Sequence, residues 1–221
     1  MDSSFAKEII VGARSSPLSR VQVEEVFSLL KIHHPDVCFK AQWFQTSGDL
    51  DQKTSLYSME KTDFFTKEID EAVLKGQCRI GIHSGKDLPD PLPKGLKLVA
   101  CTQGINPSDV VVLRDGESLE TLKVGAKVGT SSFRREKNIK EVRSDLLCMD
   151  IRGPIERRLA LLDSGEVDAL IMAKAALIRL KIFKNEIELP GEVCPMQGRL
   201  AVVAQENDRE IESLFSCIHS P

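Results

Sequence analysis

The segment HSGKD, residues 83–87, combines a lysine and a carboxylate directly after a short apolar run and ahead of three prolines. The apolar run is typical of a buried strand, so Lys86 and Asp87 would stand where that strand ends. The prolines would restrict the motion of the following loop. A fixed carboxylate can stabilise a developing cation or orient an N–H donor. An ion pair of Asp87 with Lys86 or with a nearby arginine explains the same residue equally well.

A second polar segment reads GTSSFRR, residues 129–135, and stands where an apolar run gives way to an expected helix. Its candidate anion-binding residues are Thr130, Ser131, Ser132, Arg134 and Arg135. A helix start adds unpaired backbone N–H groups and a partial positive charge. The two arginines are adjacent and diverge by about 100° on a helix, so they can flank an anion. Such a site suits a carboxylate or phosphate, and a capped helix with surface arginines is the alternative.

Arginines recur where predicted strands end. These are Arg14, Arg134, Arg135, Arg152, Arg158 and Arg179. Arginine binds carboxylates through a bidentate fork, and a hydrogen bond to a charged group contributes roughly 1.5–3 kcal/mol. The chain as a whole is acidic, with a net charge of −3, so clustered cations would repel one another unless they bind an anion. Together the six favour a ligand with several carboxylates.

The elements that must position these residues alternate between strands and helices. Strands are expected at 8–13, 37–44, 79–83, 96–101, 109–114, 126–130, 146–151, 168–173 and 200–205. Helices are expected from Ser16-Pro17 to residue 31, at 62–76, from 131–132, between Pro154 and Gly165, and shortly after 173. The alternation predicts an α/β fold with mostly parallel sheets.

Two breaks rich in glycine, proline and polar residues, 101–108 and 190–198, predict two crossings between lobes. Lobe 1 would comprise 1–101 and 200–221, and lobe 2 would comprise 102–199. A ligand cleft is expected between them, where strand ends meet.

The composition, 42% hydrophobic and 29% charged over 221 residues, is that of a globular protein. The negative net charge gives no pull toward nucleic acid or anionic membranes. No signal-peptide pattern and no apolar window of about 18 residues is present, so we expect a cytoplasmic protein with no membrane partner.

The six cysteines show no metal-ligand spacing, so no metal site is expected. Four are expected to be buried: Cys38, Cys78, Cys101 and Cys148. The other two, Cys194 and Cys217, lie in more polar segments, where a reactive role is an alternative.

The ordered motifs resemble one enzyme family over nearly the whole chain. They are ARSSPLSRVQ, HSGKDLPD, VGTSSFRR, DIRGPIERRL, GEVDALIMAKAALIRL and CPMQGRLAV. The chain resembles hydroxymethylbilane synthase, also called porphobilinogen deaminase, which joins four porphobilinogen units head to tail with release of ammonia in tetrapyrrole (haem) biosynthesis. The resemblance implies two periplasmic-binding-protein-like lobes, a monomer, porphobilinogen as substrate and dipyrromethane as cofactor. Each pyrrole brings an acetate and a propionate, which matches the arginine count.

The resemblance also assigns roles to residues of this chain. Asp87 corresponds to the catalytic aspartate, which stabilises the pyrrole N–H and the azafulvene cation left when ammonia departs. Substrate and cofactor binding would fall to Arg14, Ser16, Lys61, Ser84, Lys86, Thr130, Ser131, Ser132, Arg134, Arg135, Arg152, Gly153, Arg158, Arg179 and Gln197.

The chain departs from the family pattern in two places. The segment SMEKTDFFTKEID keeps Lys61 but lacks the usual glycines, and Tyr57 replaces a second lysine. The family's third domain carries a cysteine that holds dipyrromethane, whereas this chain ends at LFSCIHSP without that cysteine's C-x-x-P setting. We therefore expect the third domain to be absent, which leaves three alternatives. The chain is part of a longer protein; or Cys217 or Cys194 is the anchor; or the protein is a non-catalytic binder of pyrroles or other small polycarboxylates.

Overall fold

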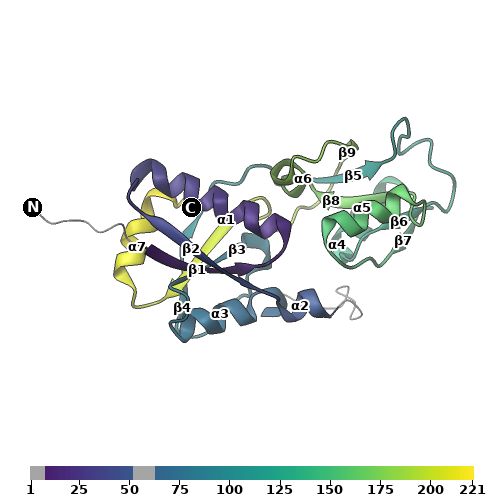
Figure 1. Cartoon of the computed structure of the whole chain (residues 1–221). Coiled ribbons are helices and arrows are strands. Elements are labelled where there is room, and N and C mark those ends of the chain that lie inside the picture. Colours follow the sequence, from purple (N-terminus) through teal and green to yellow (C-terminus); the bar gives the residue numbers. More distant parts are fainter. Residues whose placement is uncertain (1–7, 52–62) are drawn as a thin grey trace, which may run out of the picture. The chain divides into compact units, whose positions relative to one another are not determined.

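The computed structural model describes residues 8–51 and 63–221. Within these residues the chain forms two compact units, drawn in Figure 1. The first unit takes in residues 8–50, 63–105 and 198–221, and the second takes in 51 and 106–197. Lys61 and Tyr57, both singled out in the sequence, lie outside the described residues.

The first unit is a five-stranded sheet with helices on both faces. Its strands, in the spatial order β2-β1-β3-β10-β4, are Cys38–Phe44, Glu8–Arg14, Ile80–Ser84, Leu200–Gln205 and Leu96–Cys101. Its helices are α1 (Pro17–His33), α2 (Ser47–Leu50), α3 (Lys67–Leu74) and α7 (Arg209–Phe215), with short 3-10 turns η1 (Asp63–Phe65), η2 (Gly85–Asp87) and η3 (Ser216–Ile218).

The two faces of this sheet follow from the alternation of side chains along β1. Ile9 and Val11 pack in one core with Val26 of α1. On the opposite face, a Cβ atom at Gly12 would lie 3.1 Å from Ile69 of α3, so the glycine lets that helix approach closely. The strand β3, which leads to Asp87, is therefore held between α1 and α3.

The second unit is also a five-stranded sheet. Its strands, in the order β7-β6-β8-β5-β9, are Leu147–Met149, Lys127–Gly129, Ala169–Ala173, Asp109–Leu113 and Asn185–Leu189. Its helices are α4 (Phe133–Val142), α5 (Ile155–Asp163) and α6 (Lys174–Leu180). Alternate residues of β5 enter two cores, with Val111 in one and Val110 in the other. The central strands are therefore buried on both faces.

The expected α/β fold with two lobes and mostly parallel sheets is confirmed, because four of the five strands in each sheet run in the same direction. In each sheet two strand pairs are parallel and two are antiparallel. The antiparallel pairs all involve β5 or β10, the first strand after each crossing between the units. Alternating patterns reveal strand positions but not strand directions. The strand β9 has no counterpart among the predicted strands, because its sequence NEIEL is mostly polar.

The two crossings stay hydrogen-bonded to each other on the side of the first unit. The Thr102 backbone N–H donates to the Leu200 carbonyl at 2.8 Å, and the Ile105 N–H donates to the Gly198 carbonyl at 3.4 Å. These bonds place 102–105 and 198–199 with the first unit. The division into folding domains at 102 and 199 stays a prediction.

Three chemical features of the described residues bear on function. Among them, no helix is both long and apolar enough to cross a membrane. The same residues hold no group of three or more side chains placed to bind a metal ion. Cys78 and Cys101 are buried as expected, whereas the expectation was wrong for Cys38, which is exposed at the start of an edge strand. Cys148 is only partly buried, and this burial raises its pKa to about 11.

Candidate functional site

Asp87 lies in a turn that is held by a backbone hydrogen bond at its start and by a buried side chain at its end. The strand β3 ends at Ser84, and the next three residues form the turn η2. The Gly85 N–H donates to the Arg199 carbonyl at 2.9 Å, and Leu88 is buried just after the turn. The Asp87 side chain is half-buried and makes no ion pair with any residue that the structure describes. Of the two explanations of Asp87, the ion pair with Lys86 or an arginine is therefore not supported.

The polar residues just before Asp87 are tied to the helices beneath. The Ser84 hydroxyl accepts a hydrogen bond from Gln22 Nε2 of α1 at 2.8 Å. His83 Nε2 lies 3.4 Å from Asp70 Oδ1 of α3, and both side chains are buried. Ser84 is thus held by the fold at the base of the turn, and its predicted contact with substrate stays a prediction.

Arg14 is engaged by an acidic residue that the sequence analysis did not identify. Its guanidinium binds both carboxylate oxygens of Asp49, with Nε 3.3 Å from Oδ2, and lies 4.6 Å from the centre of the Phe65 ring. Burial opposes ionisation of Asp49, but Arg14 outweighs it and lowers the pKa of that carboxyl. Ser16 caps α1, as predicted, accepting from the Ser19 N–H at 3.2 Å. Because Arg14 already binds Asp49, only some of its N–H groups remain for a ligand.

The hydroxyl groups at the start of α4 mainly serve the fold. Ser132 is the N-cap, and its Oγ accepts from the Arg135 N–H at 3.5 Å. Thr130 Oγ1 accepts from the Ser132 N–H at 3.3 Å, and Ser131 Oγ donates to the Ile151 carbonyl. Thr130 is 1% exposed and Ser131 is 9% exposed. To donate to a ligand, Ser131 would have to leave its hydrogen bond to the Ile151 carbonyl, whereas Thr130 only accepts in its bond and keeps its O–H as a donor.

The cap of α4 gives a direct test of this turn. We expect Ser132→Ala to lower the free energy of unfolding by about 1 kcal/mol, because an N–H of the first turn loses its acceptor. Ser132→Asn, which keeps a capping oxygen, should stay close to the wild type in the same urea titration. Equal losses in both variants would show that the cap bond does not stabilise the helix.

Arg134 and Arg135 converge on one buried carboxylate, Asp109. Arg135 Nη2 and Nε lie 2.6 and 3.0 Å from Oδ1, and Arg134 Nη2 lies 2.6 Å from Oδ2. Gln197 Nε2 donates to the same Oδ1 at 3.0 Å and to the Pro107 carbonyl at 2.6 Å. Burial opposes ionisation of Asp109, but the two arginines outweigh it and lower its pKa. The structure thus brings together three predicted binding residues around an acid.

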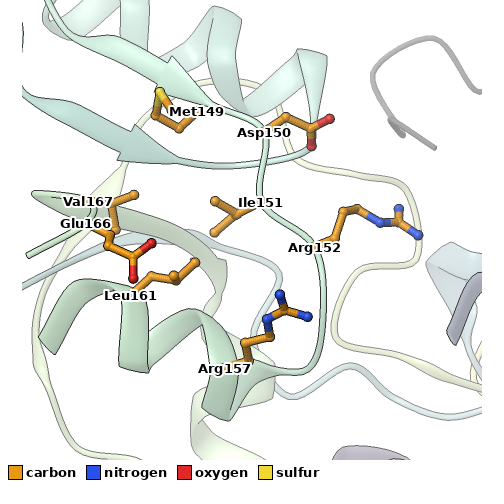
Figure 2. A pocket seen from close by; sticks show the side chains of 8 residues that line it. All are labelled: Met149, Asp150, Ile151, Arg152, Arg157, Leu161, Glu166 and Val167. Carbon is orange, nitrogen blue, oxygen red and sulfur yellow. The ribbon is translucent and has the colours of Figure 1, made fainter. Parts of the chain in front are cut away.

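A second group of cations lies at the end of β7 and the start of α5, where a pocket of about 330 Å³ opens. It is lined by Met149, Asp150, Ile151, Arg152, Arg157, Leu161, Glu166 and Val167 (Figure 2). In Figure 2 Ile151 points toward Leu161 and Val167, whereas the Arg152 side chain points to the opposite side of the backbone. The pocket combines an apolar wall with charges of both signs.

The backbone of the loop before α5 accommodates and hydrogen-bonds the arginine side chains near it. Gly153 has a φ of +102°, a conformation that side chains rarely adopt, and a Cβ atom there would lie 3.0 Å from Arg157 Cδ. The Gly153 carbonyl accepts from Arg158 Nε at 2.9 Å. Arg152 Nη2 donates to the Asp51 carbonyl at 2.9 Å. Arg179, in α6, is only 8% exposed.

The predicted site residues therefore fall into separate groups. The first unit holds Arg14, Ser16, Ser84, Lys86 and Asp87; the second holds Thr130, Ser131, Ser132, Arg134, Arg135, Arg152, Gly153, Arg158, Arg179 and Gln197. Their convergence on one cleft stays a prediction. Asp109 was missed, although it carried a signal: a lone acid at the head of an all-apolar strand needs a cationic partner when buried.

Comparisons with known proteins point to one family. The family model described as "Porphobilinogen deaminase, dipyromethane cofactor binding domain" matches residues 9–213. A probable porphobilinogen deaminase of Chlamydia pneumoniae is 38% identical over 95% of this chain and 89% of its own length. The porphobilinogen deaminase of Thermus thermophilus is 39% identical over 96% of this chain and 70% of its own length.

Solved structures support the fold alone. The methionine binding protein MetQ aligns with a TM-score of 0.58 at 15% identity, covering 95% of this chain and 89% of its own. A periplasmic substrate-binding protein of an ABC transporter from Coxiella burnetii aligns with a TM-score of 0.57 at 15% identity, covering 96% and 92%. The expectation of a fold like that of periplasmic binding proteins is confirmed.

Proposed function

Because the chain belongs to the porphobilinogen deaminase family, we propose that it binds porphobilinogen and joins it head to tail with release of ammonia. One observation carries this proposal: Asp87 lies in a fixed turn at the end of β3, half-buried and without an ion pair among the described residues. A carboxylate that is fixed and not ion-paired can accept a hydrogen bond from the pyrrole N–H and stabilise the cation that forms as ammonia leaves. The product would be the linear hydroxymethylbilane of tetrapyrrole biosynthesis.

The second unit supplies groups suited to the acidic side chains of pyrroles. Arg134 and Arg135 together carry one more positive charge than the single carboxylate that they share. The pocket lined by Arg152 and Arg157 is also lined by Ile151 and Leu161, and this mix of cationic and apolar side chains suits a ring with carboxylate arms. We propose that these two groups bind the acetate and propionate groups of substrate and cofactor.

The arginines described above suit the carboxylates of dipyrromethane, whereas the cysteines are less suited to attaching it covalently. When bound, dipyrromethane would supply the primer to which the first porphobilinogen is joined. Cys217 is exposed, yet desolvation raises the pKa of its thiol, which disfavours the reactive thiolate, and Cys217 Sγ lies 3.3 Å from the Leu214 carbonyl. Cys194 lies half-buried in the segment that leads to Gln197. We therefore propose that Cys217 is not the anchor.

Intact-mass measurement with an ammonia assay tests the proposed function. Purified protein incubated with porphobilinogen should release ammonia and gain mass in whole pyrrole units. Cys217→Ser should keep any such adduct, and its loss in that variant alone would make Cys217 the anchor after all. Cys194→Ser is the matched variant, and loss of the adduct there alone would identify Cys194.

The second candidate function is a non-catalytic binder of pyrroles or other small polycarboxylates. The raised pKa of the Cys217 thiol favours it, because a thiol that stays protonated is a poor nucleophile for the covalent attachment of a primer. An unmodified mass and no ammonia release, together with measurable porphobilinogen binding in calorimetry, would support the binder over the enzyme.

A further inference from the structure

The first strand of the second unit begins with a buried acid that neither the motifs nor the proposed chemistry uses. Asp109 opens β5, between β8 and β9, and is 0% exposed. The four residues after it, Val110 to Leu113, are all apolar and buried. A buried carboxylate is stable only when it is paired and hydrogen-bonded. All of its partners are side chains that the sequence analysis places in the binding site.

The hydrogen bonds of this acid divide unevenly between its two oxygens. Oδ1 accepts from Arg135 Nε, Arg135 Nη2 and Gln197 Nε2, and Oδ2 accepts from Arg134 Nη2. Arg134 also donates from Nη1 to the Glu192 carbonyl, and Arg135 donates from Nη1 to the Ile171 carbonyl at 3.4 Å. Since an arginine carries five N–H groups, roughly three on Arg134 and two on Arg135 remain for a further acceptor.

Two adjacent arginines on a helix would otherwise separate. Their side chains leave α4 about 100° apart, and their like charges repel. A carboxylate whose two oxygens bind one guanidinium each brings both to the same place. The side chains of Arg134 and Arg135 remain 19% and 11% exposed, whereas that of Asp109 is 0% exposed. A ligand can therefore reach the arginines but not the acid that holds them.

We propose that Asp109 is a positioning residue, which aims the remaining N–H groups of Arg134 and Arg135 at a carboxylate of the substrate. The inference rests on the proposed function, since it takes a porphobilinogen carboxylate as the occupant. Asp109 also links this pair to the connecting segments, because Gln197 Nε2 bonds both Asp109 and the Pro107 carbonyl. The arginine pair, β5 and both segments that enter and leave the second unit thus share one buried acid.

Nuclear magnetic resonance of arginine side chains tests the geometry without any ligand. The Nε–H proton of Arg135 should exchange slowly with solvent in the wild type, because it donates to a buried carboxylate. The Nε–H of Arg209, whose side chain is 82% exposed, gives the reference for fast exchange. Arg135→Lys and Arg209→Lys assign the two signals. Exchange of Arg135 as fast as that of Arg209 would overturn the inference, and this measurement needs no variant of Asp109 to fold.

Porphobilinogen affinity in a double-mutant cycle tests the positioning role. Asp109→Asn should weaken binding about ten- to a hundredfold, the range that one or two charge-assisted hydrogen bonds cover. In an Arg134→Gln/Arg135→Gln background, the same substitution should cost no further affinity, because Asp109 acts through those side chains. Losses that simply add would overturn the positioning role.

Asp168→Asn is the matched control, since Asp168 is also paired with an arginine in the second unit and its side chain is 13% exposed. It should leave porphobilinogen affinity at the wild-type value, and an equal loss would attribute the Asp109 effect to general destabilisation. A wild-type protein with slow Arg135 exchange but no porphobilinogen binding would contradict the proposed function. The buried arrangement around Asp109 would then stand without a substrate role.

Discussion

Asp87→Asn is expected to leave the protein folded and to lower ammonia release from porphobilinogen by about 10²–10³-fold or more. Asparagine keeps the size of the side chain but cannot stabilise a cation by charge. The turn itself is fixed by backbone bonds of Gly85 and Leu88, which the substitution does not touch. Initial rates of ammonia release, with circular dichroism as a check on folding, measure both effects.

The matched control for this prediction is Asp90→Asn in the same loop. Asp90 is exposed, and its replacement makes the same change in charge three residues further on. It should keep wild-type rates. If Asp87→Asn also keeps them, the catalytic role given to Asp87 is wrong; if both variants lose activity, the loop charge rather than Asp87 itself matters.

Arg135→Ala is expected to lower the free energy of unfolding of the second unit by about 3 kcal/mol at neutral pH. The substitution removes two of the four hydrogen bonds to the buried carboxylate of Asp109 and one of its two cations. Breaking a buried ion pair from one side is costly, because the other charge stays buried with less compensation. Urea unfolding followed by circular dichroism measures the change. Trp43, the only tryptophan, lies in β2 of the first unit, so its fluorescence reports on the other unit separately.

This effect should depend on pH in a defined direction. In the wild type Asp109 has a lowered pKa, so its contribution to stability is fully present above the unfolded value, near 3.9, and is lost as the pH falls through the folded value. Without Arg135 the effect of burial counts for more, and the pKa of Asp109 should rise. The difference in stability between wild type and Arg135→Ala should therefore be largest near pH 7 and shrink below about pH 4.

A second substitution separates lost charge pairing from lost packing. In Arg135→Ala/Asp109→Asn the uncompensated carboxylate is gone, so part of the stability should return relative to Arg135→Ala alone. If the double variant is less stable than the single one, and the single variant shows no dependence on pH, the ion pair is not the source of the effect.

Much of the fold could be predicted from local patterns. Ser16 and Ser132 were expected near the helix starts, and both cap their helices in the structure. The reversed direction of β5 and β10 could not be predicted, because it is set by the path of the chain between units rather than by local sequence. β9 was missed for a related reason: its polar residues alternate around Ile187, and only pairing with β5 makes the segment a strand.

The site was predictable as a set of residue types but not as a set of contacts. The count of arginines identified an acidic ligand as the simplest partner, yet Arg14, Arg134 and Arg135 each bind an aspartate of this chain. Asp49 lies 35 positions from Arg14 in the sequence. Asp109 lies 25 positions from Arg134 and 26 from Arg135. Composition cannot distinguish a cation that is paired within the chain from one that is open to a ligand. Only the tertiary fold makes that distinction.

The strand order of the first unit also constrains how the protein is made. β10 lies between β3 and β4, yet it follows the whole of the second unit in the sequence. On the ribosome, β3 and β4 emerge long before the strand that joins them, so the second unit can complete its sheet first. The nascent chain must therefore carry two unjoined edges of apolar strand until residues 200–205 emerge, which makes this interval the one in which chaperones would have the most to protect.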